Sequence, residues 1–141
     1  MMQIFISHAR ADAALAQALS SALETAGFSV WNPDNILPGD NWRKEFGAAL
    51  ESSELMVALF SRHAKEDTNV TRDVQFALTS GNYRGRVVPV LVDFVTFVAG
   101  SEVPWVLLRM DPVYLTGASP DFSEIVNRVR GLAGTASNAS R

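Results

Sequence analysis

The sequence predicts an α/β domain with a doubly wound, five-stranded parallel sheet and helices on both of its faces. Five short apolar segments of strand length alternate with stretches of helical periodicity, which is the pattern of such sheets. The run ELMVALF at 54–60 is apolar at nearly every position, as expected for a strand covered on both faces. The length of 141 residues suits one domain, and 48% apolar with 19% charged residues is a globular composition.

Each strand is predicted from a compact run of β-branched or aromatic residues bounded by polar or turn residues. The predicted strands are 3–7, 28–31, 54–60, 86–92 and 111–116. Pro89 falls inside the fourth of them and suggests a bulge or an edge position there. The loop 32–40 after the second strand contains two prolines, a glycine and Asx residues.

Each helix is predicted from apolar residues spaced three and four apart. The predicted helices are 11–26, closed by Gly27; one capped by Asp40 or Asn41; 68–78; and 119–132, with Ser119 as its N-cap. The small, polar segment 133–141 is expected to be a flexible tail or a linker to a missing domain, which leaves 1–132 as the folded domain.

Composition excludes several classes of site and partner. A net charge of −3 and a pI near 5.3 argue against direct binding of nucleic acid, and no cationic face suits a membrane surface. The absence of cysteine excludes disulfides and thiolate chemistry, and His8 and His63 are too few for a histidine-built metal site. No segment resembles a signal peptide or a membrane span, so a cytoplasmic protein is expected.

Ligands of doubly wound sheets bind at the carboxyl ends of the strands. The loops expected there are 7–11, 32–40, 61–68 and 93–104, together with the start of the helix that carries Asp73. These loops lack GxGxxG, a P-loop, the clustered acids of a phospho-receiver and the GxSxG of a serine hydrolase.

Five segments taken in order, IFISHARAD, AGFSVWNPDNILPGDNW, ELMVALFS, NVTRDVQFAL and RVVPVLVD, resemble a bacterial Toll/interleukin-1 receptor (TIR) domain. The resemblance spans about residues 2–132 and implies the flavodoxin-like TIR fold. Many members of that family cleave NAD at the nicotinamide–ribose bond, some of them in antiphage defence. Other members are non-catalytic adaptors that assemble through the loop after the second strand, the BB loop.

The resemblance places Asp73 at the position of the family's catalytic glutamate and Asn69 where a tryptophan is frequent. NAD is then a substrate, with no cofactor and no metal. The implied substrate-binding residues are Ser7, His8, Ala9, Arg10, Trp31, Asp34 and Asn69. The implied assembly residues of the BB loop are Pro33, Ile36, Leu37, Pro38 and Gly39. Implied partners are other TIR copies in a head-to-tail assembly and a sensor domain beyond Arg141.

Periodicity alone leaves simpler explanations open. Asp73 could be a helix-dipole charge beside the buried stripe, and Trp31 could be a core residue. Asp34 could be a turn-forming residue, and His8 and Arg10 could belong to an ordinary surface loop.

Overall fold

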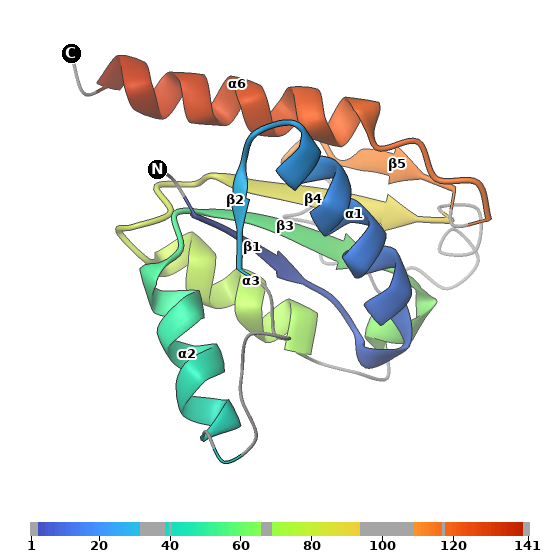
Figure 1. Ribbon diagram of the computed structural model, residues 1–141, viewed down its shortest axis with the longest axis horizontal. Coiled ribbons are helices and arrows are strands. Elements are labelled where there is room, and N and C mark those ends of the chain that lie inside the picture. The colour runs from blue at the N-terminus through green and yellow to red at the C-terminus, as the bar shows by residue number, and fades with distance from the viewer. Residues whose placement is uncertain are drawn as a thin grey trace.

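The computed structural model describes residues 3–31, 39, 41–65, 69–93, 109–116 and 118–139. Its centre is one parallel sheet with the strand order β2-β1-β3-β4-β5 (Figure 1). The strands are β1 (Gln3–Ser7), β2 (Ser29–Val30), β3 (Leu55–Phe60), β4 (Val87–Val92) and β5 (Val113–Leu115). The order reverses direction at β1 and β3, so the predicted doubly wound sheet is confirmed.

Helices cover both faces of this sheet (Figure 1). One face carries α1 (Ala13–Thr25) and α6 (Ser123–Ala139), and the other carries α2 (Trp42–Ser52) and α3 (Asn69–Thr79). Two short 3-10 helices, η1 (Arg10–Asp12) and η3 (Arg62–Lys65), follow β1 and β3. They therefore lie at the carboxyl edge of the sheet, where the sequence places the ligand-binding loops.

The core consists of two hydrophobic clusters separated by the sheet. Alternate residues of β1 enter opposite clusters: Ile4 packs in the cluster under α1 and α6, and Phe5 packs in the cluster under α2 and α3. Every residue of β3 is buried, because both of its faces are covered. This alternation decides which helix each side chain at the end of a strand can reach.

Two of the predicted helix ends are confirmed by their hydrogen bonds. Asn41 caps α2, its side-chain oxygen accepting from the Lys44 backbone N–H at 3.2 Å. After α1, the N–H groups of Gly27 and Phe28 donate to carbonyl oxygens of the last helical turn, each at 3.0 Å. Gly27 has φ +99°, the left-handed conformation that such a helix end requires.

The closing helix differs from its predicted bounds of 119–132. Asp121, rather than Ser119, makes the capping interactions, accepting from the Ser123 backbone N–H at 3.0 Å and from its hydroxyl at 2.6 Å. These two hydrogen bonds lower the pKa of Asp121, and the bond from the Ser123 hydroxyl has the larger effect. The helix starts later because the first turn is fixed by this aspartate. It also continues to Ala139, through a segment expected to be flexible that contains several alanines.

Pro89 occupies an internal strand, so the predicted bulge or edge is wrong in this form. It pairs with Ala58 in an uninterrupted parallel register. The Arg86 carbonyl accepts from Met56 on β3, and by alternation the Pro89 nitrogen faces the β5 side. β5 begins only opposite Val90, so the missing N–H of the proline breaks no bond of the sheet.

Candidate functional site

Serines end two neighbouring strands at the carboxyl edge of the sheet. Ser7 is the last residue of β1, and Ser61 directly follows β3. Their side chains face opposite sides of the sheet. Phe5 and Phe60 both pack in the cluster under α2 and α3. Side chains alternate along a strand, so Ser7, two residues after Phe5, faces that cluster, and Ser61, one residue after Phe60, faces away from it. Ser7 therefore faces α3, and Ser61 faces α1. Each of these serines contacts a buried aspartate.

The first pair joins β1 to α3. The Ser7 hydroxyl donates to Oδ2 of Asp73 at 2.8 Å, and the two residues are 1% and 6% exposed. Both side chains are almost removed from water, so water could not easily replace this charge-assisted hydrogen bond, and losing the bond would be costly. A carboxylate is thereby fixed at the edge where ligands of such sheets bind.

Asp73 is not a solvated helix charge. The helix dipole acts most strongly in the first turn of a helix. α3 begins at Asn69, so Asp73 lies beyond that turn. The side chain is buried with its helical neighbours Val70 and Val74. The expectation that Asp73 lies beside the buried stripe is therefore wrong, because the Ser7 hydroxyl gives its carboxylate a partner inside.

Tyr83 lies close enough to Asp73 for the negative charge of the carboxylate to disfavour ionisation of its phenol. Burial raises the pKa of Tyr83 above its ordinary value of 10.0, the negative charge of Asp73 adds to this, and a hydrogen bond with Ser53 acts against it. The phenol is fully buried and donates to the Leu50 carbonyl at 2.6 Å. The Tyr83 phenol therefore keeps its proton and its hydrogen bond inside the protein.

The predicted substrate-binding loop after β1 is half inside the protein. Ala9 is 1% exposed, His8 is partly buried and Arg10 is exposed at the start of η1. His8 Nδ1 lies 2.8 Å from the Ala9 carbonyl oxygen and therefore carries the proton, which leaves Nε2 to act as an acceptor in the neutral ring. The loop thus offers one imidazole and one guanidinium within three residues of Ser7 in the sequence.

Trp31 packs in an aromatic group beneath α2. Its ring stacks on Phe5 with centroids 5.6 Å apart and meets the Phe46 ring edge-on, also at 5.6 Å. These contacts agree with the core role that the sequence leaves open for Trp31. Contact of Trp31 with a substrate stays a prediction.

The second pair was missed by sequence analysis. The Ser61 hydroxyl donates to Oδ2 of Asp12 and accepts from the backbone N–H of His63 at 3.1 Å. Asp12 and Ser61 are 8% and 4% exposed. One signal was present in the sequence: FIS and LFS both end an apolar strand in serine at adjacent positions of the expected sheet.

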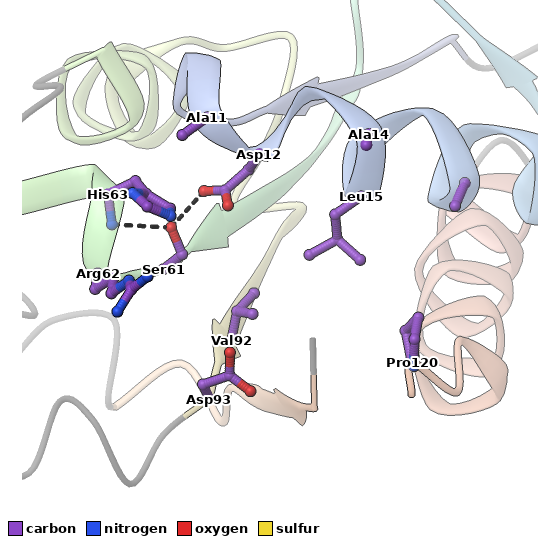
Figure 2. A pocket seen from close by; sticks show the side chains of 11 residues that line it. Ala11, Asp12, Ala14, Leu15, Ser61, Arg62, His63, Val92, Asp93 and Pro120 are labelled. Atoms are coloured by element: carbon purple, nitrogen blue, oxygen red, sulfur yellow. Dashed lines mark hydrogen bonds between the residues drawn. The ribbon is translucent and has the colours of Figure 1, made fainter. Parts of the chain in front are cut away.

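The second pair opens on a pocket of about 580 Å³ (Figure 2). The pocket lies between the first turns of α1, the start of η3 and the end of β4. Its lining residues are Ala11, Asp12, Ala14, Leu15, Ala18, Ser61, Arg62, His63, Val92, Asp93 and Pro120. Asp93 is held there with φ +55°, a left-handed conformation that aspartate tolerates better than most residues. Asp73 does not line this pocket.

The sequence matches the family model described as "TIR domain" over residues 4–126. The chain belongs to the TIR domain family. This TIR domain matches no curated protein sequence.

Solved structures of similar fold include several TIR proteins. The TIR domain of a Toll-related receptor from Hydra magnipapillata has a TM-score of 0.63 at 21% identity, covering 92% of this chain and 97% of that one. A TIR-STING receptor from C. gigas has a TM-score of 0.65 at 19% identity; the match covers 92% of this chain but only 38% of the receptor. The TIR domains of the activated Roq1 resistosome have a TM-score of 0.58 at 15% identity, covering 96% and 99% of the two chains.

The fold is also shared outside immune receptors. A 2-deoxyribosyltransferase from Bacillus psychrosaccharolyticus, described as a biocatalyst for nucleoside synthesis, has a TM-score of 0.53 at 16% identity. The match covers 89% of this chain and 90% of the enzyme. At these identities the likeness shows the fold alone.

The BB loop of this TIR domain lies mostly outside the described residues. Pro33, Asp34, Ile36, Leu37 and Pro38 fall there, as does the side chain of Asn69. Gly39 is described, in a turn with φ +95°. The roles assigned to these residues remain predictions.

Over the described ranges, no group of three or more histidine and acidic residues is arranged to hold a metal ion. Within the same ranges, no helix is long and apolar enough to cross a membrane.

Proposed function

We propose that this TIR domain cleaves NAD at the bond between nicotinamide and ribose, with Asp73 as the catalytic carboxylate. The observation that carries the proposal is the Ser7–Asp73 pair: a buried carboxylate at the ligand-binding edge that accepts the Ser7 hydroxyl at 2.8 Å. The TIR family of the chain supports the reaction type, and the sequence resemblance places Asp73 at the position of the family's catalytic acid.

The reaction demands little of the protein. When the glycosidic bond breaks, its electron pair goes to the nitrogen of nicotinamide, which leaves as a neutral ring and needs no acid. Positive charge develops on the ribose, as in glycoside hydrolysis. The Asp73 carboxylate would face that charge and accept from the ribose hydroxyls. A water molecule, or a hydroxyl of the nucleotide itself, then attacks the ribose carbon and loses a proton.

Ser7 would act as a positioning residue for Asp73. An aspartate is shorter than the glutamate of the resembling enzymes by one bond, roughly 1.5 Å. Misplacement on that scale can cost about a hundredfold in rate. The Ser7 hydroxyl donates to Oδ2, and this bond would fix the direction of the carboxylate toward the substrate.

The rest of the substrate pocket is proposed to come from the loop after β1 and from the BB loop. Arg10 is exposed at the rim and carries a charge suited to the NAD phosphates. Self-assembly would complete the pocket through Ile36 and Leu37 of the BB loop, in a bacterial defence or signalling protein whose sensor lies elsewhere.

The second candidate is a non-catalytic assembly module. A specific observation favours it: Asp73 has only 6% exposure and a serine partner, as a structural carboxylate also would. In that case the Ser7–Asp73 bond serves stability, and the BB loop alone carries the function.

Nicotinamide release separates the two. We would measure it for the purified chain and for Asp73→Asn and Asp73→Glu, each dilute and clustered on a surface. Asp73→Asn should lower the rate a hundred- to a thousandfold, as expected when one preorganised electrostatic group is lost. Asp73→Glu should keep or raise the rate. Glu51→Gln, which removes an exposed charge at the far end of α2, is the matched control and should retain full activity.

Two results would overturn the catalytic role. Turnover that survives Asp73→Asn at the original rate would mean that another group does the chemistry. No turnover in the original chain, with turnover appearing in Asp73→Glu, would show that aspartate has silenced an enzyme scaffold and would favour the assembly module. Thermal midpoints measured alongside distinguish lost chemistry from lost structure.

A further inference from the structure

The pocket beside Asp12 and Ser61 has no role in the proposed NAD cleavage. We propose that it binds a ribonucleoside, with the flat base against the α1 wall and the ribose hydroxyls on the carboxylate of Asp12. A volume of about 580 Å³ lies within the usual range of small-molecule sites.

The polar side of the pocket presents a fixed acceptor. Asp12 is 8% exposed, and its Oδ2 takes the Ser61 hydroxyl (Figure 2). No hydrogen bond within the described part of the chain engages its other oxygen. That oxygen is not fully enclosed either, because the described residues contain no buried side-chain oxygen without a partner. A preorganised carboxylate oxygen is therefore open to a donor in the pocket.

The Ser61 hydroxyl holds the carboxylate and is not itself a ligand group. It donates to Asp12 and accepts from the His63 backbone N–H at 3.1 Å, so its proton is already used. The pocket thus selects molecules that bring their own hydroxyl or amine donors. A vicinal diol is suited to such a site because both hydroxyls can donate to one carboxylate.

Another part of the pocket lining is apolar. α1 contributes Ala14, Leu15 and Ala18 at helical spacing, and Pro120 lies across from them (Figure 2). Ala14 and Ala18 are exposed, with side chains too small to fill the space in front of them. A flat aromatic ring would cover this wall and remove its apolar surface from water.

Other ligand classes fit the lining less well. A metal ion lacks a third histidine or acidic ligand among the described residues. A free inorganic anion would meet two carboxylates, Asp12 and Asp93, against one cation, Arg62. An aliphatic molecule would leave the carboxylate of Asp12 without a donor.

This site is independent of the proposed function. The Asp12–Ser61 pair faces α1, whereas the Ser7–Asp73 pair faces α3 across the sheet. Binding can therefore be measured in an Asp73→Asn background, where nicotinamide release is not needed as a readout. Failure of either proposal then leaves the other standing.

The test is isothermal titration calorimetry of the whole chain with adenosine and with 2′-deoxyadenosine. Adenosine should bind, and loss of the 2′-hydroxyl should weaken binding about tenfold or more, as for one hydrogen bond to a charged group. Ala14→Leu should weaken adenosine binding at least tenfold by filling the wall. Ala13→Leu, which places the same side chain on an exposed neighbouring position outside the pocket, should not.

Alanine and leucine have similar helix propensities, so both variants should fold. Equal thermal midpoints for the two variants would establish this. Three results would overturn the proposal: no adenosine binding up to millimolar concentration, equal affinity for the deoxy form, or binding that Ala14→Leu leaves unchanged.

Discussion

Removing the Ser7 hydroxyl should destabilise the domain and impair its chemistry together. Ser7→Ala leaves Asp73, at 6% exposure, without the hydroxyl that donates to its Oδ2 at 2.8 Å. A hydrogen bond to a charged group contributes about 1.5–3 kcal/mol. For a chain of 141 residues, we expect a drop of roughly 5–10 °C in the thermal midpoint.

A double-mutant cycle isolates the pair. Ser7→Ala, Asp73→Ala and the double variant are unfolded in urea, and the coupling energy should be about 1–2 kcal/mol. Ser20→Ala is the control. It removes a hydroxyl from another buried serine, 8% exposed, but this hydroxyl donates at 3.2 Å to Glu24 one turn along the same helix. Its cost should be near zero, because alanine is the better helix former.

Single costs that simply add, within about 0.5 kcal/mol, would mean that the 2.8 Å bond between Ser7 and Asp73 contributes nothing. A loss of stability without loss of nicotinamide release would contradict the positioning role of Ser7 and leave its structural role intact.

Three further predictions concern the rest of the chain. Because the pKa of Tyr83 is raised, the native state keeps the phenol proton above pH 10 and the unfolded state loses it. The free energy of unfolding should therefore fall by about 1.4 kcal/mol per pH unit above pH 10. In urea unfolding, Tyr83→Phe should show a shallower fall of that free energy with pH. Gly27→Ala should destabilise the domain by about 1 kcal/mol because Gly27 has φ +99°, while Gly47→Ala, inside α2, should stabilise it by a similar amount. An added Cβ meets no atom within 4 Å at either position, so the two effects come from the backbone alone. Equal melting curves for the two variants would contradict this. Polar replacement of Ile36 and Leu37 should reduce self-association in analytical ultracentrifugation with little change in thermal midpoint. A large fall in that midpoint would place the two residues in the core.

The fold was predictable because its main signals are local. The run at 54–60 is apolar throughout, and β3 is buried at every position. The turn after α1 needed a left-handed residue, and Gly27 marked it. The start of α6 was not predictable from the preference of serine for caps, because Ser119 and Asp121 both qualify by residue type and only the hydrogen bonds to Ser123 decide.

The candidate site was predictable as a location but not as a set of contacts. Parallel topology brings Ser7 and the helix of Asp73 to one edge, and the sequence allowed that inference. Burial of Asp73 could not be read from helical spacing, because an aspartate off the apolar stripe is normally solvated. Its partner is 66 positions away, and such a bond exists only once the sheet has formed. Asp12 escaped notice for the same reason, with a partner 49 positions away.

The two serine–aspartate pairs are crossed, and the crossing follows from the pleat. Ser7 ends β1 but contacts Asp73 on the helix after β3, while Ser61 follows β3 but contacts Asp12 in the turn after β1. β1 and β3 are adjacent strands, and Ser7 pairs with Ala58. Ser61 comes three residues after Ala58, just beyond the end of β3, so its side chain faces the other side of the sheet. Each segment after a strand is therefore tied to the other strand. The Asp12–Ser61 bond joins the turn after β1 to the end of β3, and the Ser7–Asp73 bond joins the end of β1 to α3. The two proposed sites thus share the ends of two strands while lying on opposite faces of the sheet.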